Sequence, residues 1–362
     1  MQIAIIGLPN STKTTVFNAL TRGSSETTAY SSGKFNMNTG TVTVPDPRVD
    51  RLTAMFKPRK TAYAQVMYAD ISGLDKGVGK GGLTGSLLNA LSESDALLHV
   101  VRGFEDATVP HSEGSIDPKR DIEIVDIELL LSDLGIVEKR IDRLKSELDR
   151  DAKKPDRPVK ETELALLQRV QAHLVAERPL RCMELTTAEM KMLRNFGLLT
   201  LKPMLVVLNV GDRLPPDALA PLAYYQHQKT TIVALQGRLE MELAQMSPEE
   251  AAEFMPEYGI TELGLNRLIS VSYDLLGLQS FFTVGEDEVR AWTIPVGATA
   301  VEAAGVIHSD LAKGFIRAEV VAYDALIAAG GMVAASQKGQ VRLEGRDYVV
   351  QDGDIMNIRF NI

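Results

Sequence analysis

Residues 2–15 read QIAIIGLPNSTKTT, and this stretch decides the fold. The apolar run at residues 3–6 predicts a buried strand, and Gly7 begins a turn. Lys13, Thr14 and Thr15 then open a predicted helix. A strand, a glycine-led loop, a Lys-Thr pair and a helix follow one another in the order of a phosphate-binding P-loop. The sequence therefore predicts an α/β fold with a phosphate site at this turn.

The chemistry of a P-loop comes from the start of its helix. Free backbone N–H groups there face the phosphates, and the helix dipole favours negative charge. We expect Lys13 to reach the terminal phosphates and the Thr14 hydroxyl to ligate Mg²⁺. The residues predicted to contact the nucleotide in this loop are Pro9, Asn10, Ser11, Thr12, Lys13, Thr14 and Thr15.

One residue departs from the P-loop pattern. G-x-x-x-x-G-K-[ST] places glycine directly before the lysine, and this chain has Thr12 there. Glycine suits the sharp bend and the close approach of backbone to phosphate. A β-branched residue held at positive φ would cost about 1–2 kcal/mol. Taken alone, the motif leaves both a nucleotide site and a chance glycine-rich turn open.

The composition is that of an ordinary globular protein of two or three domains. The 362 residues are 45% apolar and 24% charged, and no apolar run approaches the roughly 18 residues of a membrane span. Met1 leads directly into the first predicted strand, so we expect no signal peptide and a cytoplasmic location. The net charge of -9 argues against nucleic-acid binding by the whole surface. Cys182 is the one cysteine, which excludes an internal disulfide and a cysteine-based metal site.

A second motif follows the P-loop region. Residues 22–40 are rich in Ser, Thr and Gly, which predicts a polar, mobile loop over the γ-phosphate. Residues 41–44 and 64–69 are predicted strands, and residues 46–56 between them a short helix. The second strand ends in the tetrapeptide DISG at residues 70–73, the D-x-x-G pattern that accompanies a P-loop.

The D-x-x-G pattern assigns metal and phosphate contacts. In this pattern Asp70 holds Mg²⁺ through water, and the Gly73 N–H contacts the γ-phosphate. Many GTPases place a water-orienting Gln next, where this chain has Leu74, which cannot orient water. Residues 76–85 are glycine-rich and predict a flexible second switch. No side chain is evident as a general base, so we expect slow turnover.

A third motif has the spacing of a base-reading segment. The apolar run at residues 204–209 predicts a strand, and it ends where NVGD matches N-K-x-D. Val210 replaces the Lys that lies along a purine, whereas Asp212 keeps the acceptor for guanine. A plain strand-to-turn boundary is the alternative. The residues predicted to contact the base are Asn209, Val210, Asp212, Gln236 and Gly237.

The histidines offer weaker candidates. His99 lies inside a predicted strand, which favours a core histidine over a catalyst. His111 lies in a polar loop and has no visible partner. His308, Ser309 and Asp310 are consecutive and cannot easily form a catalytic triad, so we expect a helix cap at Ser309 or Asp310.

A helical hairpin is predicted in the middle of the chain. Apolar residues recur at alternating spacings of three and four, a heptad seam: Ile127, Leu130, Leu134, Val137, Ile141, Leu144 and Leu148. A polar turn at residues 153–158 separates them from a second predicted helix at 161–176, so the two should pack antiparallel. Residues 138–160 contain nine basic and six acidic residues. This locally basic tip fits either a solvated helix end or an arm that touches RNA or a ribosomal surface.

The remaining segments complete the prediction. A capping box at residues 186–189 should begin a helix that stops near Gly197, and further helices are expected at 248–258 and 261–276. From residue 281 onward, strand, helix and more strands predict a small β-grasp domain. That part has seven basic and eleven acidic residues, so its charge does not support RNA binding.

Several longer stretches are distinctive. They are VPDPRVDRL (44–52), DISGL (70–74), HVVRGFED (99–106), DPKRDIEIVDIELLLSDL (117–134), LKPMLVVLNV (201–210), LEMEL (239–243), FFTVGEDEVRAWTIP (281–295), AAGVIHSDLAKGFIRAEVVAYD (303–324) and EGRDYVVQDGDI (344–355). On these stretches the chain resembles the Obg-like ATPase family, also called the YchF family, over essentially its full length.

The resemblance implies three parts. These are a Ras-like nucleotide-binding domain (residues 1–125 and 198–280), an inserted helical coiled-coil domain (126–197) and a C-terminal TGS domain of β-grasp type (281–362). It also implies a hydrophobic residue in place of the catalytic Gln, which is Leu74 here. Family members bind and hydrolyse ATP, often in preference to GTP, and associate with ribosomes.

Three positions depart from the family pattern. Thr12 replaces the P-loop glycine, and Lys34 falls where relatives carry the Thr that ligates Mg²⁺. Asp212 stands where relatives carry a Glu tied to adenine tolerance, although Val210 keeps the non-GTPase second position. Both ATP and GTP therefore stay open, with ATP favoured by the resemblance.

Two functions follow. The first is a slow Mg²⁺-dependent ATPase or GTPase that regulates translation or stress responses on the ribosome. It would bind ribosomal RNA through the basic arm, with the TGS domain as a second candidate surface, and without a membrane. Its catalytic residues are Lys13 and Gly73, and its metal ligands are Thr14 and Asp70. The second is a catalytically impaired adaptor that senses nucleotide or ignores it, motivated by the departures above and by Leu74.

Overall fold

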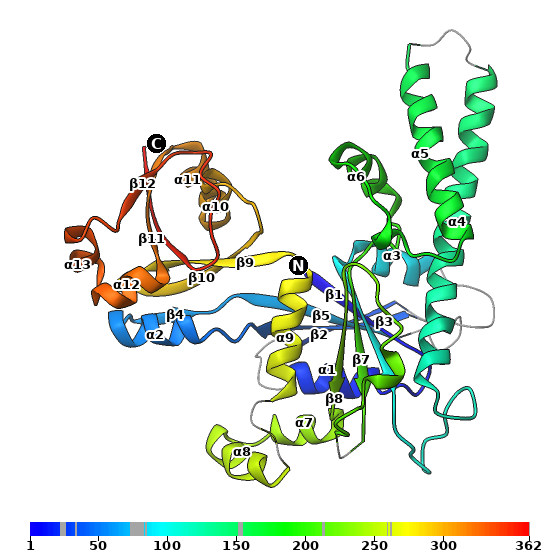
Figure 1. The fold of residues 1–362 in the computed structure, drawn as a ribbon, viewed down its shortest axis with the longest axis horizontal. Helices are drawn as coiled ribbons and strands as arrows, with labels where there is room; N and C mark the ends of the chain where they lie inside the picture. The colour runs from blue at the N-terminus through cyan, green and yellow to red at the C-terminus, as the bar shows by residue number, and fades with distance from the viewer. Residues whose placement is uncertain are drawn as a thin grey trace. The chain divides into compact units, whose positions relative to one another are not determined.

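The computed structural model describes residues 1–21, 27–32, 35–72, 83, 85–150, 155–211, 214–258, 260 and 263–361. Figure 1 shows their helices and strands. Contacts within the chain divide it into two compact units. The first unit comprises residues 1–41 and 67–265, and the second comprises residues 42–66 and 266–362. Across the described residues, no helix combines the length and the apolar character needed to cross a membrane.

The first unit is built on a seven-stranded sheet with the order β2-β3-β5-β1-β6-β7-β8. The strands are β1 (Gln2–Ile6), β2 (Thr27–Ser32), β3 (Phe35–Thr43), β5 (Gln65–Ser72), β6 (Ala96–Arg102), β7 (Met204–Asn209) and β8 (Thr230–Leu235). From β5 through β1, β6 and β7 to β8, neighbouring strands pair in parallel. Because parallel strands share one carboxyl edge, the carboxyl ends of β1, β5 and β7 lie along the same edge of the sheet.

The prediction of a polar loop at residues 22–40 is wrong for the described part of that segment. β2 and β3 form an antiparallel hairpin, in register from Thr27 opposite Gly40 to Ser32 opposite Phe35. Polar β-branched residues such as Thr are compatible with strands, and backbone pairing decides the outcome. Composition alone does not reveal that pairing partner. The strand expected at residues 41–44 corresponds to the end of β3.

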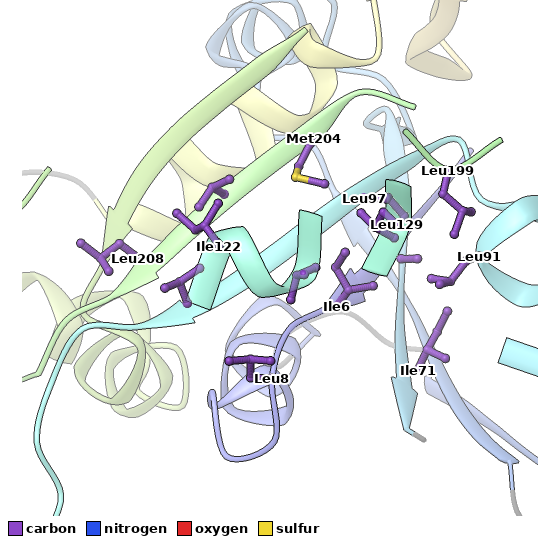
Figure 2. Packing of buried hydrophobic residues seen from close by; sticks show 14 of the residues in the cluster. Ile6, Leu8, Ile71, Leu91, Leu97, Ile122, Leu129, Leu199, Met204 and Leu208 are labelled. Atoms are coloured by element: carbon purple, nitrogen blue, oxygen red, sulfur yellow. The ribbon is translucent and has the colours of Figure 1, made fainter. Parts of the chain in front are cut away.

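The core of the first unit lies between the sheet and helix α4 (Pro118–Arg150). Figure 2 shows Ile122 and Leu129 of α4 among the side chains of Ile6, Leu97 and Leu208 from the sheet. All of these side chains are buried. β6 is buried along its whole length, as parallel strands covered on both faces usually are. This packing holds the strand ends that carry the motifs.

Shorter helices complete the first unit. They are α1 (Lys13–Thr21), α3 (Gly85–Glu93), α5 (Arg157–Val175), α6 (Thr187–Leu193), α7 (Gly237–Leu243) and α8 (Pro248–Phe254), and α9 (Gly264–Leu275) begins in it. The predicted capping box is present, with the Thr186 hydroxyl accepting from the Glu189 N–H. The short 3-10 turn after α6 ends at Gly197, which has φ +64°. The prediction for this helix is confirmed.

Beyond the sheet, α4 pairs with α5 as a two-helix arm, visible in Figure 1. Val137, Ile141 and Leu144 of α4 are buried against Leu167 and Val170 of α5. The heptad seam therefore predicts the contact between these helices. The domain limits expected from the resemblance remain a prediction, and the one at residues 125/126 falls inside the continuous helix α4.

One member of the predicted seam faces outward. Ile127 is 50% exposed, so its assignment to the seam is wrong. At this level α4 packs on the sheet core through Ile122, Val125 and Leu129. A helix that changes partners along its length changes its buried face as well, and a single heptad register does not describe both parts.

A buried carboxylate ties α4 to the segment before β7. Asp133 accepts hydrogen bonds from the backbone N–H groups of Leu199 and Thr200, both at 2.8 Å, and from the Thr200 hydroxyl at 2.6 Å. Burial raises the pKa of Asp133 to about 6, although these three donors oppose the shift. The contact anchors the arm where it leaves the sheet.

The second unit contains a six-stranded sheet with the order β12-β11-β13-β9-β10-β4. Its strands are β4 (Lys60–Ala62), β9 (Leu278–Val284), β10 (Glu288–Pro295), β11 (Phe315–Ala322), β12 (Arg342–Glu344) and β13 (Asp354–Phe360). Its α-helices are α2 (Pro47–Phe56), α10 (Ala300–Ile307), α11 (Ser309–Lys313), α12 (Tyr323–Ala329) and α13 (Met332–Gln337), with most of α9. Ala300, Ala303 and Ala304 of α10 lie in its core.

Residues 42–66 group with the C-terminal residues, although the resemblance places them in the nucleotide-binding part. β4 pairs in parallel with β10. Arg48 of α2 contacts Asp352 at 2.7 Å and also pairs with Asp46, which caps the same helix. Burial opposes the charge of Arg48, but its two carboxylate partners prevail and raise its pKa. This polar contact joins the two sequence segments of the unit.

The cap expected at Ser309 or Asp310 is placed wrongly by one or two residues. His308 is the N-cap of α11, and its Nδ1 accepts a hydrogen bond from the Asp310 N–H at 3.2 Å. The chain is extended at His308, with φ −162° and ψ 142°, so α10 and α11 are two helices rather than one. A histidine nitrogen here takes the place that Ser or Asp usually occupies.

Candidate nucleotide-binding site

The P-loop stretch forms a tight turn between β1 and α1. β1 ends at Ile6 and α1 begins at Lys13, as the sequence predicts. Gly7 has φ +150°, and a Cβ atom there would lie 2.4 Å from the carbonyl oxygen of Val100. Such a separation is far inside van der Waals contact. Glycine is therefore needed where the loop passes the neighbouring strand β6.

Thr12 stands directly before the lysine and has φ +71°. The left-handed backbone expected there is confirmed, and it costs about 1–2 kcal/mol for a β-branched residue. Its hydroxyl donates to the Ser11 carbonyl and accepts from the Asn209 side-chain amide. The hydroxyl thus gains two polar contacts that a glycine would not make.

Lys13 lies within the loop rather than in solvent. Its Nζ donates hydrogen bonds to the carbonyl oxygens of Gly7 at 3.1 Å and Leu8 at 2.7 Å, and the residue is buried. The ammonium group is therefore held at the N-terminus of α1, where helix N–H groups are available to a ligand. A cation beside such groups is an arrangement that binds phosphate.

The two predicted metal ligands are in contact. Thr14 Oγ1 donates to Asp70 Oδ2 at 2.9 Å, and Asp70 is buried at the carboxyl end of β5. Hydroxyl and carboxylate oxygens are the hard donors that Mg²⁺ prefers, so these residues fit the expected ion. Among the described residues, no group of three or more His, Cys, Asp or Glu could hold a metal. Phosphate oxygens would have to complete the coordination.

Asn209 joins the base-reading segment to the P-loop. Its Nδ2 donates to Thr12 Oγ1 at 2.5 Å, and its Oδ1 accepts from the Gly237 N–H at 2.9 Å. A Cβ atom at Gly237 would lie 2.8 Å from that Oδ1, so a larger residue would displace the amide. These contacts fix both ends of the Asn209 side chain, which is buried.

The other predicted residues lie in varied surroundings. Val210 is 6% exposed and packs in the core of the first unit, which leaves little of its side chain for a base. Gln236 is buried at the start of α7. Pro9, Asn10 and Ser11 lie in the turn, and Thr15 in the first turn of α1. Lys34, Gly73, Leu74 and Asp212 lie outside the described residues.

Arg102 lies near the P-loop, and motif analysis of the sequence does not identify it. Its guanidinium is buried and donates to the carbonyls of Phe104 at 3.0 Å and Val109 at 2.9 Å. Asn10 of the P-loop reaches the same segment, since its Nδ2 donates to the Pro110 carbonyl at 3.1 Å. These hydrogen bonds place residues 104–110 beside the P-loop. The sequence signal for Arg102 is an arginine at the end of a largely apolar strand.

Two histidines lie close to these elements. His111 has a partner, contrary to expectation: its Nε2 lies 2.8 Å from Asp121 Oδ2, and the ring is buried. The surroundings of His99 agree with a core histidine, because it is fully buried in β6. Burial, then the charges of Lys13 and Arg181, lower the pKa of His99 to about 3, so it is neutral.

Two family models match the chain. Residues 2–159 match MMR_HSR1, described as a 50S ribosome-binding GTPase, and residues 278–361 match YchF-GTPase_C, described as a protein of unknown function (DUF933). The Ribosome-binding ATPase YchF of Bacillus subtilis (strain 168) is 42% identical over 99% of this chain and 98% of its own length. The chain belongs to the YchF family. The Escherichia coli O157:H7 member is 40% identical over the same shares of the two chains.

Solved structures agree with membership of the YchF family. The Schizosaccharomyces pombe YchF GTPase matches with a TM-score of 0.86 and 31% identity, over 99% of this chain and 97% of its own. A GTP binding protein from Pyrococcus horikoshii OT3, with a TM-score of 0.58 and 17% identity over both full chains, shares the fold. The bacterial YchF relatives are named ATPases and the yeast one a GTPase, so the names of these relatives do not agree on the base.

Proposed function

We propose that this YchF-family protein binds a purine nucleoside triphosphate with Mg²⁺, hydrolyses it slowly and regulates translation or stress responses on the ribosome. The observation that carries the proposal is the meeting of three motifs at one edge of the sheet. Thr14 contacts Asp70, and Thr12 contacts Asn209, which lies 197 residues away in sequence. The proposal assigns the phosphate end of one site to the P-loop, the metal end to the D-x-x-G segment and the base end to the N-V-G-D segment.

In this proposal the chain positions charge rather than supplying a general base. The Lys13 ammonium and the N–H groups of α1 bind the terminal phosphates and stabilise the negative charge that develops during hydrolysis. Thr14 and Asp70 would hold Mg²⁺, and the bound ion would neutralise phosphate charge. Gly73 is assigned a backbone contact to the γ-phosphate. With Leu74 where many GTPases have Gln, no side chain orients the water, so we expect slow turnover.

We infer a preference for ATP over GTP. The bacterial relatives are named ATPases, and Val210 replaces the lysine that GTPases use along the purine. Asp212 supplies the one feature that favours guanine. The Asp212 carboxylate would distinguish GTP from ATP by accepting hydrogen bonds from guanine. Asp212→Glu moves that carboxylate, so it should lower the affinity for GTP more than that for ATP.

A second candidate is an adaptor that binds nucleotide without hydrolysing it. Thr12 favours this alternative. Its Cβ occupies the place where a glycine lets backbone approach phosphate, and its hydroxyl is bonded to Asn209. Lys34 adds a cation on the segment expected to cover the phosphates and could substitute for part of the metal charge. Binding without turnover would distinguish this protein from an enzyme.

Calorimetric titration of the full chain with ATP and with GTP, each with and without Mg²⁺, tests the binding step. We expect Mg²⁺-dependent binding that is tighter for ATP. Binding of neither nucleotide below about millimolar concentration would contradict the proposal, since that corresponds to only about 4 kcal/mol of binding free energy. Phosphate release measured on the same samples then separates the enzyme from the adaptor.

Association with the ribosome is proposed through the arm. The bacterial relatives are named ribosome-binding. Several described arm cations already have carboxylate partners: Arg140 pairs with Glu163, and Arg157 with Glu161. Ion pairs that remain in contact with solvent contribute little free energy. The arm can therefore still contact RNA. Its carboxylates offset part of its positive charge, so its net charge is smaller than the number of its basic residues.

Charge reversal tests the arm. Lys153→Glu, Lys154→Glu and Arg157→Glu together should weaken co-sedimentation with ribosomes and flatten its salt dependence, because fewer counterions are released on binding. An unchanged salt slope would make the arm a solvated hairpin. The C-terminal part is acidic, so a role for it in RNA binding rests on the family resemblance.

A further inference from the structure

The sole cysteine of the chain lies beside a histidine at the base of the arm. Cys182 ends the 3-10 helix η2 (Leu180–Cys182), which follows α5. Its Sγ is 3.6 Å from His227 Nδ1, although the two residues are 45 positions apart in sequence. Both are partly exposed, so a small reagent can reach them. This pair is separate from the residues of the candidate nucleotide site.

The imidazole in this pair is held as a neutral base. Burial, then the nearby charge of Arg181, lower the pKa of His227, and the Asp126 carboxylate opposes them. The ring packs edge-on against Tyr225, with centroids 4.6 Å apart. Since Nδ1 faces the sulfur, a neutral ring can accept the thiol proton there and carry its own proton on Nε2.

A buried cation lies in the same cluster. The Arg181 side chain is fully buried and donates to Thr230 Oγ1 at 2.9 Å and to Tyr225 Oη at 3.1 Å. Asp126 of α4 lies 3.7 Å from the guanidinium, and the Arg181 Nη1 has no hydrogen-bond partner among the described residues. Arg181 directly precedes Cys182 in the chain, and its guanidinium charge acts on His227, where it favours the neutral form of the ring.

We propose that Cys182 and His227 form a reactive thiol–imidazole pair that undergoes exchange with small disulfides. His227 Nδ1 takes the thiol proton, and the Cys182 sulfur attacks one sulfur of the disulfide. A new S–S bond forms to that half, the old S–S bond breaks, and the departing thiolate takes the proton from His227. The products are a mixed disulfide on Cys182 and one small thiol, and a thiol reductant reverses the reaction.

The position of the pair suggests what the adduct disturbs. Leu180 packs in the core of the arm, whereas Arg181 reaches Thr230 of β8 and Asp126 of α4. η2 therefore links the arm to the sheet. An adduct on Cys182 displaces the His227 ring from the sulfur, and that ring packs on Tyr225, so modification should lower the melting temperature of the first unit.

The first test uses oxidised glutathione on the full-length protein. Intact-mass measurement should show one glutathione adduct, removed by dithiothreitol, and Cys182→Ser should show none. Because the chain has one cysteine, any thiol signal reports this site. A wild-type protein that stays unmodified while a cysteine peptide reacts under the same conditions would overturn the proposal.

The second test measures the rate of alkylation by iodoacetamide at about pH 7. His227→Gln should slow the reaction about tenfold, because the base is lost. His173→Gln is the matched control: His173 is also partly buried near η2, but its ring bonds the Pro179 carbonyl at 3.3 Å rather than the thiol. Equal rates in wild type and His227→Gln, or faster labelling of the variant, would overturn the proposal.

A pH profile on the wild type decides the matter if His227→Gln fails to fold. An ordinary thiol loses reactivity about tenfold per pH unit below its usual pKa of about 8.5. Assisted by His227, the rate should fall less than about threefold between pH 7.5 and 6.5. The charged and titratable groups that face the pair are Arg181, Asp126 and Tyr225, and burial raises the pKa of Asp126 and that of Tyr225. A tenfold fall would overturn the proposal.

Discussion

In the candidate nucleotide site, polar contacts join segments far apart in sequence, whereas several ion pairs of the arm join residues one helical turn apart. Thr14 and Asp70 are 56 positions apart, and Thr12 and Asn209 are 197 apart. In the arm, Arg143 pairs with Glu147 at a spacing of four. The first kind of contact exists only in the folded chain, but the second is available to an isolated helix.

Burial explains why the two kinds of contact differ in importance. Asp70 and Asn209 are buried, and an unsatisfied buried polar group costs about 1–3 kcal/mol. The ion-pair partners in the arm keep part of their surface in water, from 19% for Glu163 to 73% for Arg143, and pairs in contact with solvent contribute about 0–1 kcal/mol. We therefore expect substitutions at buried polar contacts to act strongly, and substitutions at arm pairs to act weakly. Four experiments test this contrast, from the largest expected effect to the smallest.

The largest effect is expected for Lys13→Ala. The variant loses the ammonium group held at the start of α1, so phosphate release should fall about 100-fold or more. Lys139→Ala removes an exposed lysine of the arm and is the control, with turnover expected within about twofold of wild type. Unchanged turnover in Lys13→Ala would refute the assignment of the site.

The buried carboxylate of Asp133 should make the stability of the protein depend on pH. Its folded pKa of about 6 lies above the unfolded value of 3.8, so its contribution to stability is fully present below 3.8 and is lost as pH rises through 6. The unfolding free energy of wild type minus that of Asp133→Asn should therefore be greater at pH 5 than at pH 7, by about 1–2 kcal/mol. Urea denaturation at both pH values measures it. A difference that does not change with pH would contradict the burial argument.

Thr12→Gly tests the departure in the P-loop. Glycine relieves the left-handed strain at φ +71°, worth about 1–2 kcal/mol, but removes the hydroxyl that bonds Asn209. We expect nucleotide affinity to rise about fivefold in calorimetry, because backbone can then approach phosphate. Thr12→Ser keeps the hydroxyl and serves as the control. A loss of affinity in Thr12→Gly would show that the Asn209 contact matters more than the strain.

The smallest effect is expected in the arm. Arg140 Nε lies 2.7 Å from Glu163 Oε1 and its Nη2 lies 2.8 Å from Oε2, so this ion pair between the two helices is bidentate. A double-mutant cycle with Arg140→Ala and Glu163→Ala should still give a coupling energy below about 1 kcal/mol, reduced further by salt. A coupling of several kcal/mol would remove the contrast between the arm and the site.

Local patterns predict much of this molecule. The P-loop, the D-x-x-G strand, the apolar strand before Asn209, the capping box at Thr186 and the outer arm each follow from neighbouring residues. The sequence predictions fail where a contact with a distant segment determines the local structure. The hairpin of β2 and β3 depends on pairing between strands, and Ile127 is exposed because α4 changes its packing partner. His111 gains Asp121 as a partner through the fold.

The sequence by itself determined that Lys13 and Thr14 begin a helix after a glycine-led turn, and that Thr12 stands where glycine is usual. Those properties depend on backbone conformation and on neighbouring residues. Only the tertiary structure decided that Thr12 bonds Asn209, that Arg102 donates to the Val109 carbonyl beside the P-loop, and that Cys182 contacts His227. Contacts of this kind pair groups from distant segments, and burial makes each group require a partner that local sequence cannot identify.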